Sequence, residues 1–506
     1  MKDSHPCDVL LGIDIGTGSV KLVFMDSRGI ILGMGKKSHS IETPNEGWAE
    51  LPIEDIWGCI RSEVMRLAKN SPQAAKRVRG IGISSLCPGL TPLSEDGRAL
   101  APSVIYMDAR SLDEAAEIRL KIPEEELFKI SGNILMPGAT SLTSILWFRN
   151  KRPDIHRNTA VYGHINTFIG KRLTGSFGID YSNASYTGLF ETTGGLRWSQ
   201  KLTHLIGLDL GYLPPIIPSW EPLGVLTNQD FIAAGLPEGI PVAMGGGDTA
   251  CSAFAVGVIE HNQVFESAGT SNVVSVCSKF PHFDKRFMNR CHVVPGRWLY
   301  HGAMSSTGAA LRWLRDEVFA LERDYEYEHI ASLVDLTSPD KPCPVFLPYM
   351  TGERSPVWDP LARGVFFGLS LSTRREHLVR ALFEACAYGT RQLLDILESM
   401  TGDKLDRILS IGGYSAIDPW NRIKADITGR VVEALNISEA AVVGAALLGG
   451  MAARVYASFH DAAMNIPKNV RKTFLPDHSY DPWYERRYTI YTSLYPRIHD
   501  LFKIQW

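Results

Sequence analysis

The chain has 506 residues, which is too long for one ordinary hydrophobic core and predicts at least two domains. Hydrophobic residues make up 45% of it and charged residues 21%, as is typical of a soluble globular protein. Its 52 basic and 55 acidic side chains give a net charge of −3, which excludes the strong electrostatic signature of nucleic-acid or anionic-membrane binding. We therefore expect a small or well-solvated partner molecule.

The eight cysteines form no Cys-x-x-Cys pair and are too sparse for a disulfide framework, so we expect reduced thiols. The first residues, Met-Lys-Asp-Ser-His-Pro, lack the apolar core and the cleavage site of a signal peptide. No apolar run approaches the roughly 20 residues that are needed to cross a bilayer. These features predict a cytoplasmic protein.

The first structural signal is a strand, a glycine turn and a second strand between Val9 and Asp26, with Gly-Thr-Gly-Ser over residues 16–19 at the turn. The backbone N–H groups of such a turn suit phosphate oxygens. Asp14, at the end of the first apolar strand, suits a magnesium–phosphate site. A plain hairpin is the alternative, because the turn lacks the P-loop spacing and enters a strand rather than a helix.

Polar side chains follow in the rest of the first half. Asp108 and Arg110 end a predicted strand, where they form either a surface ion pair of little energetic value or a pair that lines a cleft and binds hydroxyl groups. Asn166, Asp180 and Asn183 lie in polar loops, and turn chemistry explains them better than ligand binding does.

Residues 241–248, Pro-Val-Ala-Met-Gly-Gly-Gly-Asp, end an apolar run in three glycines and a carboxylate. Three successive glycines give up side-chain packing and cost backbone entropy, so we expect other atoms to come very close to the main chain here. Asp248 then has two interpretations, the cap of the following helix or a catalytic carboxylate. The loop alone does not decide between them.

Residues 263–276 repeat the pattern of residues 10–23, which is strand, Gly-Thr-Ser-Asn or Gly-Thr-Gly-Ser, and strand. The repeat predicts two domains of related topology that each present a phosphate-binding turn to a shared cleft. Residues 346–364 form a long loop rich in proline and charge, a kind that is usually functional or interface-forming. Residues 440–451 predict a helix of small residues that allows close packing.

With Asp14-Ile-Gly-Thr-Gly, Gly246-Gly-Asp248, Gly269-Thr-Ser and Gly412-Gly413 in this order, the chain resembles the FGGY carbohydrate kinases from about residue 9 to residue 456. Residues 349–384 resemble the xylulokinase branch. The resemblance implies an α/β protein with the two-domain actin/hexokinase/Hsp70-like (ribonuclease H-like) fold, whose duplicated mixed-sheet domains flank a central cleft. We expect a sugar-binding domain over residues 1–257 and an ATP-binding domain over residues 258–506, with a helical tail from about residue 457.

The resemblance also implies the chemistry, which is transfer of the γ-phosphoryl group of ATP, with Mg²⁺, to a hydroxyl group of a ketose such as the pentulose xylulose. Asp248 is the implied general base, and Asp14 and Asp248 are the implied metal ligands. The implied substrate-binding residues are Cys87, Pro88, Asp108, Arg110, Asp248 and Thr249. The implied ATP-binding residues are Thr17, Gly18, Ser19, Lys21, Gly269, Thr270, Gly308, Gly412, Gly413, Tyr414 and Asn421. No nucleic-acid or membrane partner is expected, and the resemblance suggests a homodimer.

Some positions depart from the family pattern. Xylulokinases usually carry Gln-Met-His-Gly where this chain has Leu-Cys-Pro-Gly over residues 86–89, and Pro88 cannot donate the hydrogen bond of a histidine. Thr249 stands where Asn is common, and Ser144 where Lys is typical. The alternatives are therefore a kinase for another sugar or polyol, of the ribulose, glycerol or erythritol type, and a catalytically silent sugar-binding regulator.

Overall fold

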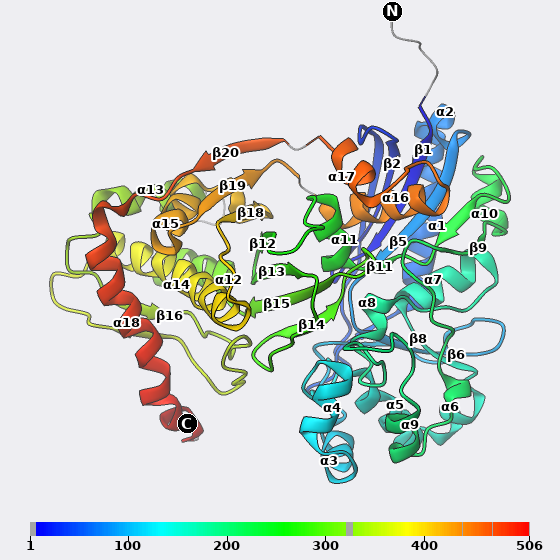
Figure 1. The fold of residues 1–506 in the computed structure, drawn as a ribbon, viewed down its shortest axis with the longest axis horizontal. Helices are drawn as coiled ribbons and strands as arrows, with labels where there is room; N and C mark the ends of the chain where they lie inside the picture. Colours follow the sequence, from blue (N-terminus) through cyan, green and yellow to red (C-terminus); the bar gives the residue numbers. More distant parts are fainter. Residues whose placement is uncertain (1–6, 320–326, 438, 468, 505–506) are drawn as a thin grey trace, which may run out of the picture.

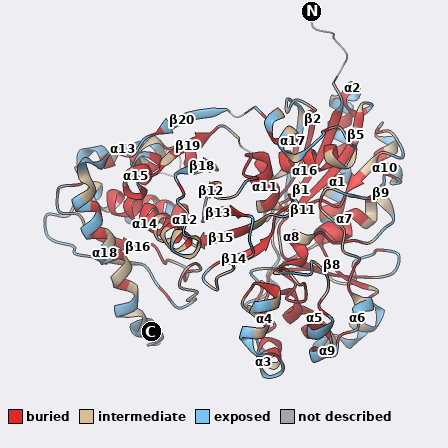
Figure 2. Ribbon diagram, viewed as in Figure 1, coloured by how far each residue is buried: buried red, intermediate tan, exposed pale blue. Residues whose placement is uncertain are grey.

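The computed structural model describes residues 7–319, 327–437, 439–467 and 469–504. Within them the chain forms two lobes, each built on a mixed seven-stranded sheet (Figure 1). Figure 2 shows that buried residues gather on both sheets and on the sides of the helices that face them. This is the expected two-domain α/β architecture.

The sheet of the N-terminal lobe has the order β3-β2-β1-β5-β10-β9, and β11 pairs with β5. Its central strand β1 runs antiparallel to β2 and parallel to β5. The strands of this sheet are β1 (Val9–Ile15), β2 (Ser19–Asp26), β3 (Ile31–Ser38), β5 (Val78–Ser85), β9 (Pro222–Val225), β10 (Pro241–Ala243) and β11 (Gly246–Gly247).

The sheet of the C-terminal lobe has the order β14-β15-β13-β12-β18-β19-β20. Its strands are β12 (Val264–Ala268), β13 (Asn272–Ser278), β14 (Met288–Cys291), β15 (Trp298–Met304), β18 (Arg407–Ile411), β19 (Val431–Leu435) and β20 (Val470–Phe474). Here β12 runs antiparallel to β13 and parallel to β18, as β1 does to β2 and β5. The predicted repeat is therefore confirmed, and both glycine-turn hairpins lie at the centres of their sheets.

Two smaller sheets and the helices complete the described residues. The small-sheet strands are β4 (Glu50–Leu51), β6 (Gly89–Leu93), β7 (Ser103–Ile105), β8 (Val161–His164), β16 (Val345–Leu347) and β17 (Val365–Phe367). The helices of the first half are α1 (Ile53–Asn70), α2 (Pro72–Ala75), α3 (Leu112–Lys121), α4 (Glu124–Ser131), α5 (Ser141–Lys151), α6 (Pro153–Asn158), α7 (Ile165–Thr174), α8 (Tyr181–Ala184), α9 (Gln200–Ile206), α10 (Gln229–Ala233) and α11 (Asp248–Ala255). Those of the second half are α12 (Thr307–Trp313), α13 (Tyr327–Ser332), α14 (Arg375–Thr401), α15 (Asp418–Thr428), α16 (Ala440–Ala452), α17 (Phe459–Asn465) and α18 (Asp481–Ile498).

The segment after residue 457 is only partly the expected helical tail. It contains α17 and α18, but β20 lies between them and extends the C-terminal sheet antiparallel to β19. Its Val-Arg-Lys-Thr-Phe sequence is exposed except at Phe474, as is common for an edge strand. In the part of the chain that the structure describes, every helix is too short or too polar to cross a membrane.

Helix α16 follows β19 of the C-terminal sheet in sequence but packs on β1 and β5 of the N-terminal lobe (Figure 1). A Cβ atom on Gly12 of β1 would lie 2.1 Å from the Val442 carbonyl oxygen, so glycine lets the helix backbone touch the sheet. On its other side, a Cβ atom on Gly444 would lie 2.0 Å from the Cys251 carbonyl oxygen of α11. This confirms the close packing predicted for residues 440–451. Helix α16 therefore packs between β1 and α11 and contacts both.

Candidate active site

A cavity of about 160 Å³ lies between the two lobes. Thr17 of the β1–β2 turn and Ser271 of the β12–β13 turn both line it, and so do Cys87, Asp248 and Thr249. The structure thus places both glycine turns, the altered 86–89 segment and the candidate base around one space. Residues far apart in the sequence meet there because each lobe presents the turn of its central hairpin to the other.

Asp248 is the first residue of α11, and Gly247 occupies the preceding cap position. The peptide N–H of Thr249 donates a hydrogen bond to Asp248 Oδ1 at 2.6 Å, and the Thr249 hydroxyl donates to the same oxygen at 3.2 Å. Burial raises the pKa of the Asp248 carboxyl, while the Arg290 charge and the two Thr249 donors oppose that rise. Asp248 therefore begins a helix and also lines the cavity, so its two interpretations are compatible.

The three glycines before Asp248 are in close contact with other parts of the protein, as their sequence predicts. Gly245 has a φ of +79°, and a Cβ atom there would lie 2.0 Å from the Ile83 carbonyl oxygen. A Cβ atom on Gly247 would lie 1.8 Å from Nη2 of Arg290. The first glycine lets the loop pass β5, and the third makes room for a cation beside the candidate base.

Asp14 is the second-last residue of β1 and is almost completely buried. The Ser84 hydroxyl donates to Asp14 Oδ1 at 2.7 Å, and Lys21 Nζ lies 3.7 Å from Oδ2. Lys21 is also held by Glu439, at 2.7 Å, just before α16. Burial raises the pKa of Asp14 to about 6, although the Lys21 charge acts in the opposite direction. The Ser84 hydroxyl thus holds the side chain in place, and a further cation beside it would favour its ionised form.

These residues fit a magnesium ion that is shared with phosphate. Within the described residues, no cluster of three or more His, Cys, Asp or Glu side chains is arranged to hold a metal by itself. Mg²⁺ in phosphoryl-transfer sites is usually held by one or two carboxylates, with substrate phosphates and water as its other ligands. Asp14 and Asp248 are both carboxylates of the N-terminal lobe, and the charge of Asp248 contributes to the raised pKa of Asp14.

The glycine turns assigned to the nucleotide converge in the C-terminal lobe. A Cβ atom on Gly308 would lie 2.4 Å from the Gly269 carbonyl oxygen, and the Tyr414 hydroxyl donates to the Gly308 carbonyl oxygen at 3.1 Å. Gly412 has a φ of +92°, and a Cβ there would lie 2.5 Å from the Ala268 carbonyl oxygen. Three turns from separate segments thus lie directly against one another.

The remaining nucleotide-binding candidates support these turns. Asn421 is fully buried and donates through Nδ2 to the Ser415 carbonyl oxygen at 2.7 Å, so it fixes the turn that begins at Gly413. The Thr270 carbonyl oxygen accepts the Ala309 N–H at 3.0 Å. In the first hairpin, the Gly18 and Ser19 carbonyl oxygens accept the N–H groups of His39 and Gly16 at 3.1 and 3.0 Å.

Three of the predicted substrate-binding residues lie outside the cavity. Asp108 accepts hydrogen bonds from the Ala49 N–H at 2.7 Å and from Arg110 Nη2 at 2.7 Å. Arg110 also pairs with Glu50 at 2.7 Å, and its guanidinium lies 3.7 Å from the centre of the Trp48 ring system. Both side chains are therefore fully engaged within the N-terminal lobe, and Pro88 is likewise buried beside the cavity without lining it.

The structure adds cavity residues that the sequence did not single out. They are Tyr106, Tyr186, Val273, Met288, Arg290, His301, Ala303 and Arg354. Arg354 belongs to the long 346–364 loop that its length marked as functional. The sequence could have indicated Arg290, because an arginine inside a short buried strand requires a partner. The polar loop residue Asp180 behaves as turn chemistry predicts, because it caps α8 by accepting from the Ser182 N–H at 2.7 Å.

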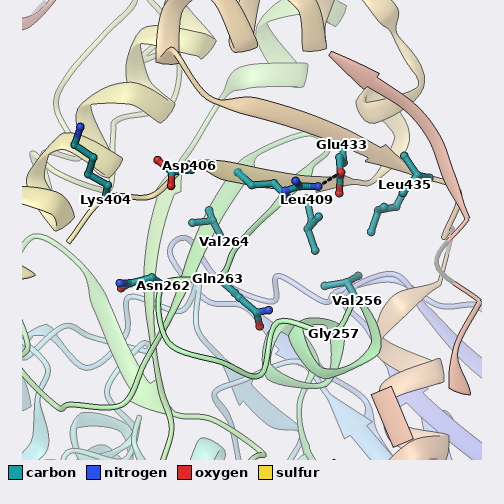
Figure 3. Close-up of a pocket in the computed structure, with 12 residues that line it drawn as sticks. Val256, Gly257, Asn262, Gln263, Val264, Lys404, Asp406, Leu409, Glu433 and Leu435 are labelled. Atoms are coloured by element: carbon teal, nitrogen blue, oxygen red, sulfur yellow. Dashed lines mark hydrogen bonds and ion pairs between the residues drawn. The ribbon is translucent and has the colours of Figure 1, made fainter. Parts of the chain in front are cut away.

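A separate cavity of about 510 Å³ lies on another part of the molecule, between the loop after α11 and the strands β18, β19 and β20 (Figure 3). Val256 and Gly257 line one side of it, and an ion pair between Arg407 and Glu433 crosses its other side. None of the predicted phosphate-turn residues and neither candidate carboxylate lines this space. It is therefore not the candidate active site.

Comparison with known proteins agrees with this geometry. The chain is 28% identical to the gluconokinase of Bacillus subtilis, with 92% of each chain covered, and 28% identical to the xylulose kinase of Escherichia coli, with 97% of this chain and 99% of the other covered. The crystal structure of xylulose kinase from Rhodospirillum rubrum, 27% identical, superposes with a TM-score of 0.91 over 98% of this chain and 100% of the other. The models of the N-terminal and C-terminal domains of the FGGY family of carbohydrate kinases match residues 9–255 and 264–453. The chain therefore belongs to the FGGY family of carbohydrate kinases, whose members are ATP-dependent sugar kinases.

Proposed function

We propose that the chain transfers the γ-phosphoryl group of ATP to a hydroxyl group of a small polyhydroxylated substrate, with Asp248 as the general base. The observation that supports this most is the position of Asp248 in a cavity that is also lined by Thr17 and Ser271, one from each glycine turn. The substrate candidates are a ketose such as xylulose and, from the names of the relatives, gluconate. Another polyol remains the alternative.

Phosphoryl transfer requires a protein mainly to position the reactants, to neutralise charge and to accept the proton of the attacking hydroxyl. Asp248 Oδ1 is held by the Thr249 N–H and hydroxyl, which leaves Oδ2 to accept that proton. The backbone of the two glycine turns would hold the phosphates from opposite lobes. Mg²⁺, held by Asp14 and Asp248 when bound, would supply additional neutralisation of phosphate charge.

The two lobes divide the binding work in this proposal. Residues 1–257 supply the base and the Cys87 and Thr249 side chains, while residues 258–506 supply the converged turns at Gly269, Gly308 and Gly412. Because water competes with the sugar as phosphoryl acceptor, closure of the two lobes on both ligands is expected to precede transfer. The eight free cysteines support a reducing, cytoplasmic setting. We also propose a homodimer, on the basis of the family resemblance alone.

The test is ADP release with a panel of ketoses, aldoses, sugar acids and polyols. The Asp248→Asn variant provides the blank, because it removes the base while keeping the size of the side chain. The proposal expects at least one compound to raise ADP release well above this blank, together with retained binding of that compound by the variant. Binding of a sugar without any turnover in the unaltered protein would favour a catalytically silent regulator instead.

A further inference from the structure

Arg290 is a buried cation from the C-terminal lobe that reaches into the N-terminal lobe. It lies on β14, which contacts α8 of the other lobe (Figure 1). The strand is fixed there by paired hydrogen bonds, since Asn133 Nδ2 donates to the Asn289 carbonyl oxygen at 2.7 Å and the Asn289 N–H donates to Asn133 Oδ1 at 2.8 Å. The position of Arg290 at the cavity is therefore built into the contact between the lobes.

The guanidinium of Arg290 is buried and only partly hydrogen-bonded, although the charges of Asp248 and Asp180 act on it at longer range. It is 2% exposed, its Nη2 donates to the Ser182 carbonyl oxygen at 3.1 Å, and it lies 4.8 Å from the Tyr186 ring centroid. Its Nε has no hydrogen-bond partner, and no carboxylate among the described residues lies within the 4.0 Å of an ion pair. A buried charge without a partner is strongly unfavourable, so such a group is expected to serve a ligand.

The two nearby carboxylates, Asp180 and Asp248, form hydrogen bonds with other residues. Asp180 accepts hydrogen bonds from the Asn166 side chain at 2.7 Å, from the Asn183 side chain at 2.6 Å and from the Ser182 N–H at 2.7 Å. Asp248 directly follows Gly247, which is in contact with Arg290, but its carboxylate is held by Thr249 and serves as the proposed base. Both carboxylates act on the Arg290 charge at longer range, but neither forms an ion pair with it.

The other polar groups of the cavity add no compensating negative charge. Arg354 brings a second guanidinium, whose Nε and Nη2 make only long hydrogen bonds of 3.4 Å to Ser305 Oγ and the Met304 carbonyl oxygen. His301 Nε2 has no partner, and burial lowers the pKa of this imidazole well below its usual value, so it is neutral. The cavity thus holds two cations and the single carboxylate Asp248.

The two guanidinium groups lie at different parts of the cavity. Arg354 is bonded to residues directly before the Gly308 turn, on the side where the phosphates are expected. Arg290 is bonded to Ser182 and packs on Tyr186, on the N-terminal side that also contains Cys87. Charge on the transferred phosphoryl group therefore accounts for Arg354 but not for Arg290.

We propose that Arg290 binds a carboxylate of the substrate, so that the chain phosphorylates an open-chain sugar acid, an aldonate or a keto-aldonate, rather than a neutral ketose or polyol. This deepens the proposed function and rests on it. The planar guanidinium suits two parallel hydrogen bonds to a carboxylate, and Nε is available for one of them. The substrate's hydroxyl group then lies at Asp248, and its carboxylate supplies the missing anion.

The test compares sugar acids with neutral polyols, which differ from them only at the charged end, and with ketoses of the same chain length. Gluconate is compared with glucitol and fructose, and xylonate with xylitol and xylulose, by ADP release. The kcat/KM for the best acid is expected to exceed that of its neutral counterparts by at least about 30-fold, the lower range for a buried charged hydrogen bond. A neutral compound used as well as its matching acid would overturn the inference while leaving the kinase assignment intact.

Variants of Arg290 give a second, independent readout. Arg290→Met is expected to raise KM for the acid at least about 30-fold while the neutral analogues change little, and Arg290→Lys to retain part of the acid preference. ADP binding measured by calorimetry and the melting temperature show whether the variants are folded. Equal loss for acids and neutral sugars would assign Arg290 a structural role and overturn the inference. Failure of every compound to exceed the Asp248→Asn blank would overturn the proposed function and this inference together.

Discussion

Gly247 and Arg290 are in direct contact across the two lobes, since a Cβ atom on Gly247 would lie 1.8 Å from Arg290 Nη2. The backbone of Gly247, with φ of −69° and ψ of 145°, is one that alanine adopts without strain. The glycine is therefore required by the guanidinium and not by the turn. This contact joins the loop that carries the candidate base to the cation that we assign to the substrate.

Gly247→Ala is expected to displace the Arg290 guanidinium from the cavity. Because the end of a long side chain can move, the fold should survive with a small change in melting temperature, while KM for the substrate rises about 10-fold or more. Steady-state kinetics with the best substrate of the panel measures this. Gly58→Ala is the matched control, since a Cβ on Gly58 of α1 meets no other atom within 4 Å. An unchanged KM in Gly247→Ala would contradict the role of this contact.

The glycine pattern of the sequence predicted a great deal of this site. Three glycines before Asp248 signalled a close approach, and the repeated Gly-Thr turn signalled two hairpins that face one cleft; both features are present. These signals can be read from a short stretch, because glycine is needed where φ is positive, as at Gly245, or where another atom comes close to the main chain, as at Gly247. The same reasoning predicted the small-residue helix α16 that packs on Gly12.

The cation of the site was not predicted, because its role depends on distant parts of the chain. Arg290 lies about 40 residues after Asp248 in sequence, and contacts between distant segments, such as the pairing of Asn133 with Asn289, bring β14 to the N-terminal lobe. Asp108 and Arg110 illustrate the converse. Their spacing is compatible with a cleft or with an ion pair, and the structure shows the ion pair, with Arg110 Nη2 2.7 Å from Asp108 Oδ2.

Removing the charge of Asp14 is expected to stabilise the ligand-free protein at alkaline pH. Burial raises the pKa of Asp14 to about 6 from 3.8, so ionisation is less favourable in the folded protein than in the unfolded chain. Protonated Asp14 therefore favours the folded state. This contribution to the free energy of unfolding is fully present below about pH 4 and is lost as pH rises through about 6. Two pKa units correspond to about 3 kcal/mol.

Denaturant unfolding of Asp14→Asn without nucleotide or metal should therefore show a gain of up to about 3 kcal/mol at pH 8 that disappears near pH 4. Phosphoryl transfer should be lost in the same variant, because the phosphate-side carboxylate is removed. Asp113→Asn is the control, since that side chain is 86% exposed. A gain that is independent of pH would show that the charge of Asp14 is not its cause.

The buried ion pair between Lys424 and Glu266 is expected to stabilise the C-terminal lobe. Lys424 lies on α15 and Glu266 on β12, and both side chains are almost completely buried. Glu266 also accepts from Asn272 Nδ2 at 2.7 Å and from Ser410 Oγ at 3.1 Å. Lys424→Met leaves a buried carboxylate without its cation, which costs about 3–5 kcal/mol.

Chemical unfolding monitored in the C-terminal lobe measures this loss. Adding Glu266→Gln to Lys424→Met should recover much of the stability, because the unpaired charge is removed. Lys472→Met is the matched control, since it breaks an exposed pair with Asp418 that is worth about 1 kcal/mol or less. Equal losses in the buried and exposed variants would contradict the importance of burial here.

Thr249 is expected to set the pH at which Asp248 can act as a base. Its hydroxyl donates to Asp248 Oδ1 at 3.2 Å and so lowers the pKa of a carboxyl that burial raises. Thr249→Val keeps the shape and the N–H donor but removes the hydroxyl, so the pKa of Asp248 should rise further. The acidic limb of the kcat/KM profile should then move to higher pH by less than about one unit, whereas Thr249→Ser should leave it in place. The acidic limb reports ionisation of the base, whereas a folding defect would lower activity at every pH. An unshifted limb in Thr249→Val would therefore contradict this prediction. It would show that the hydroxyl contacts the substrate and does not set the pKa of Asp248.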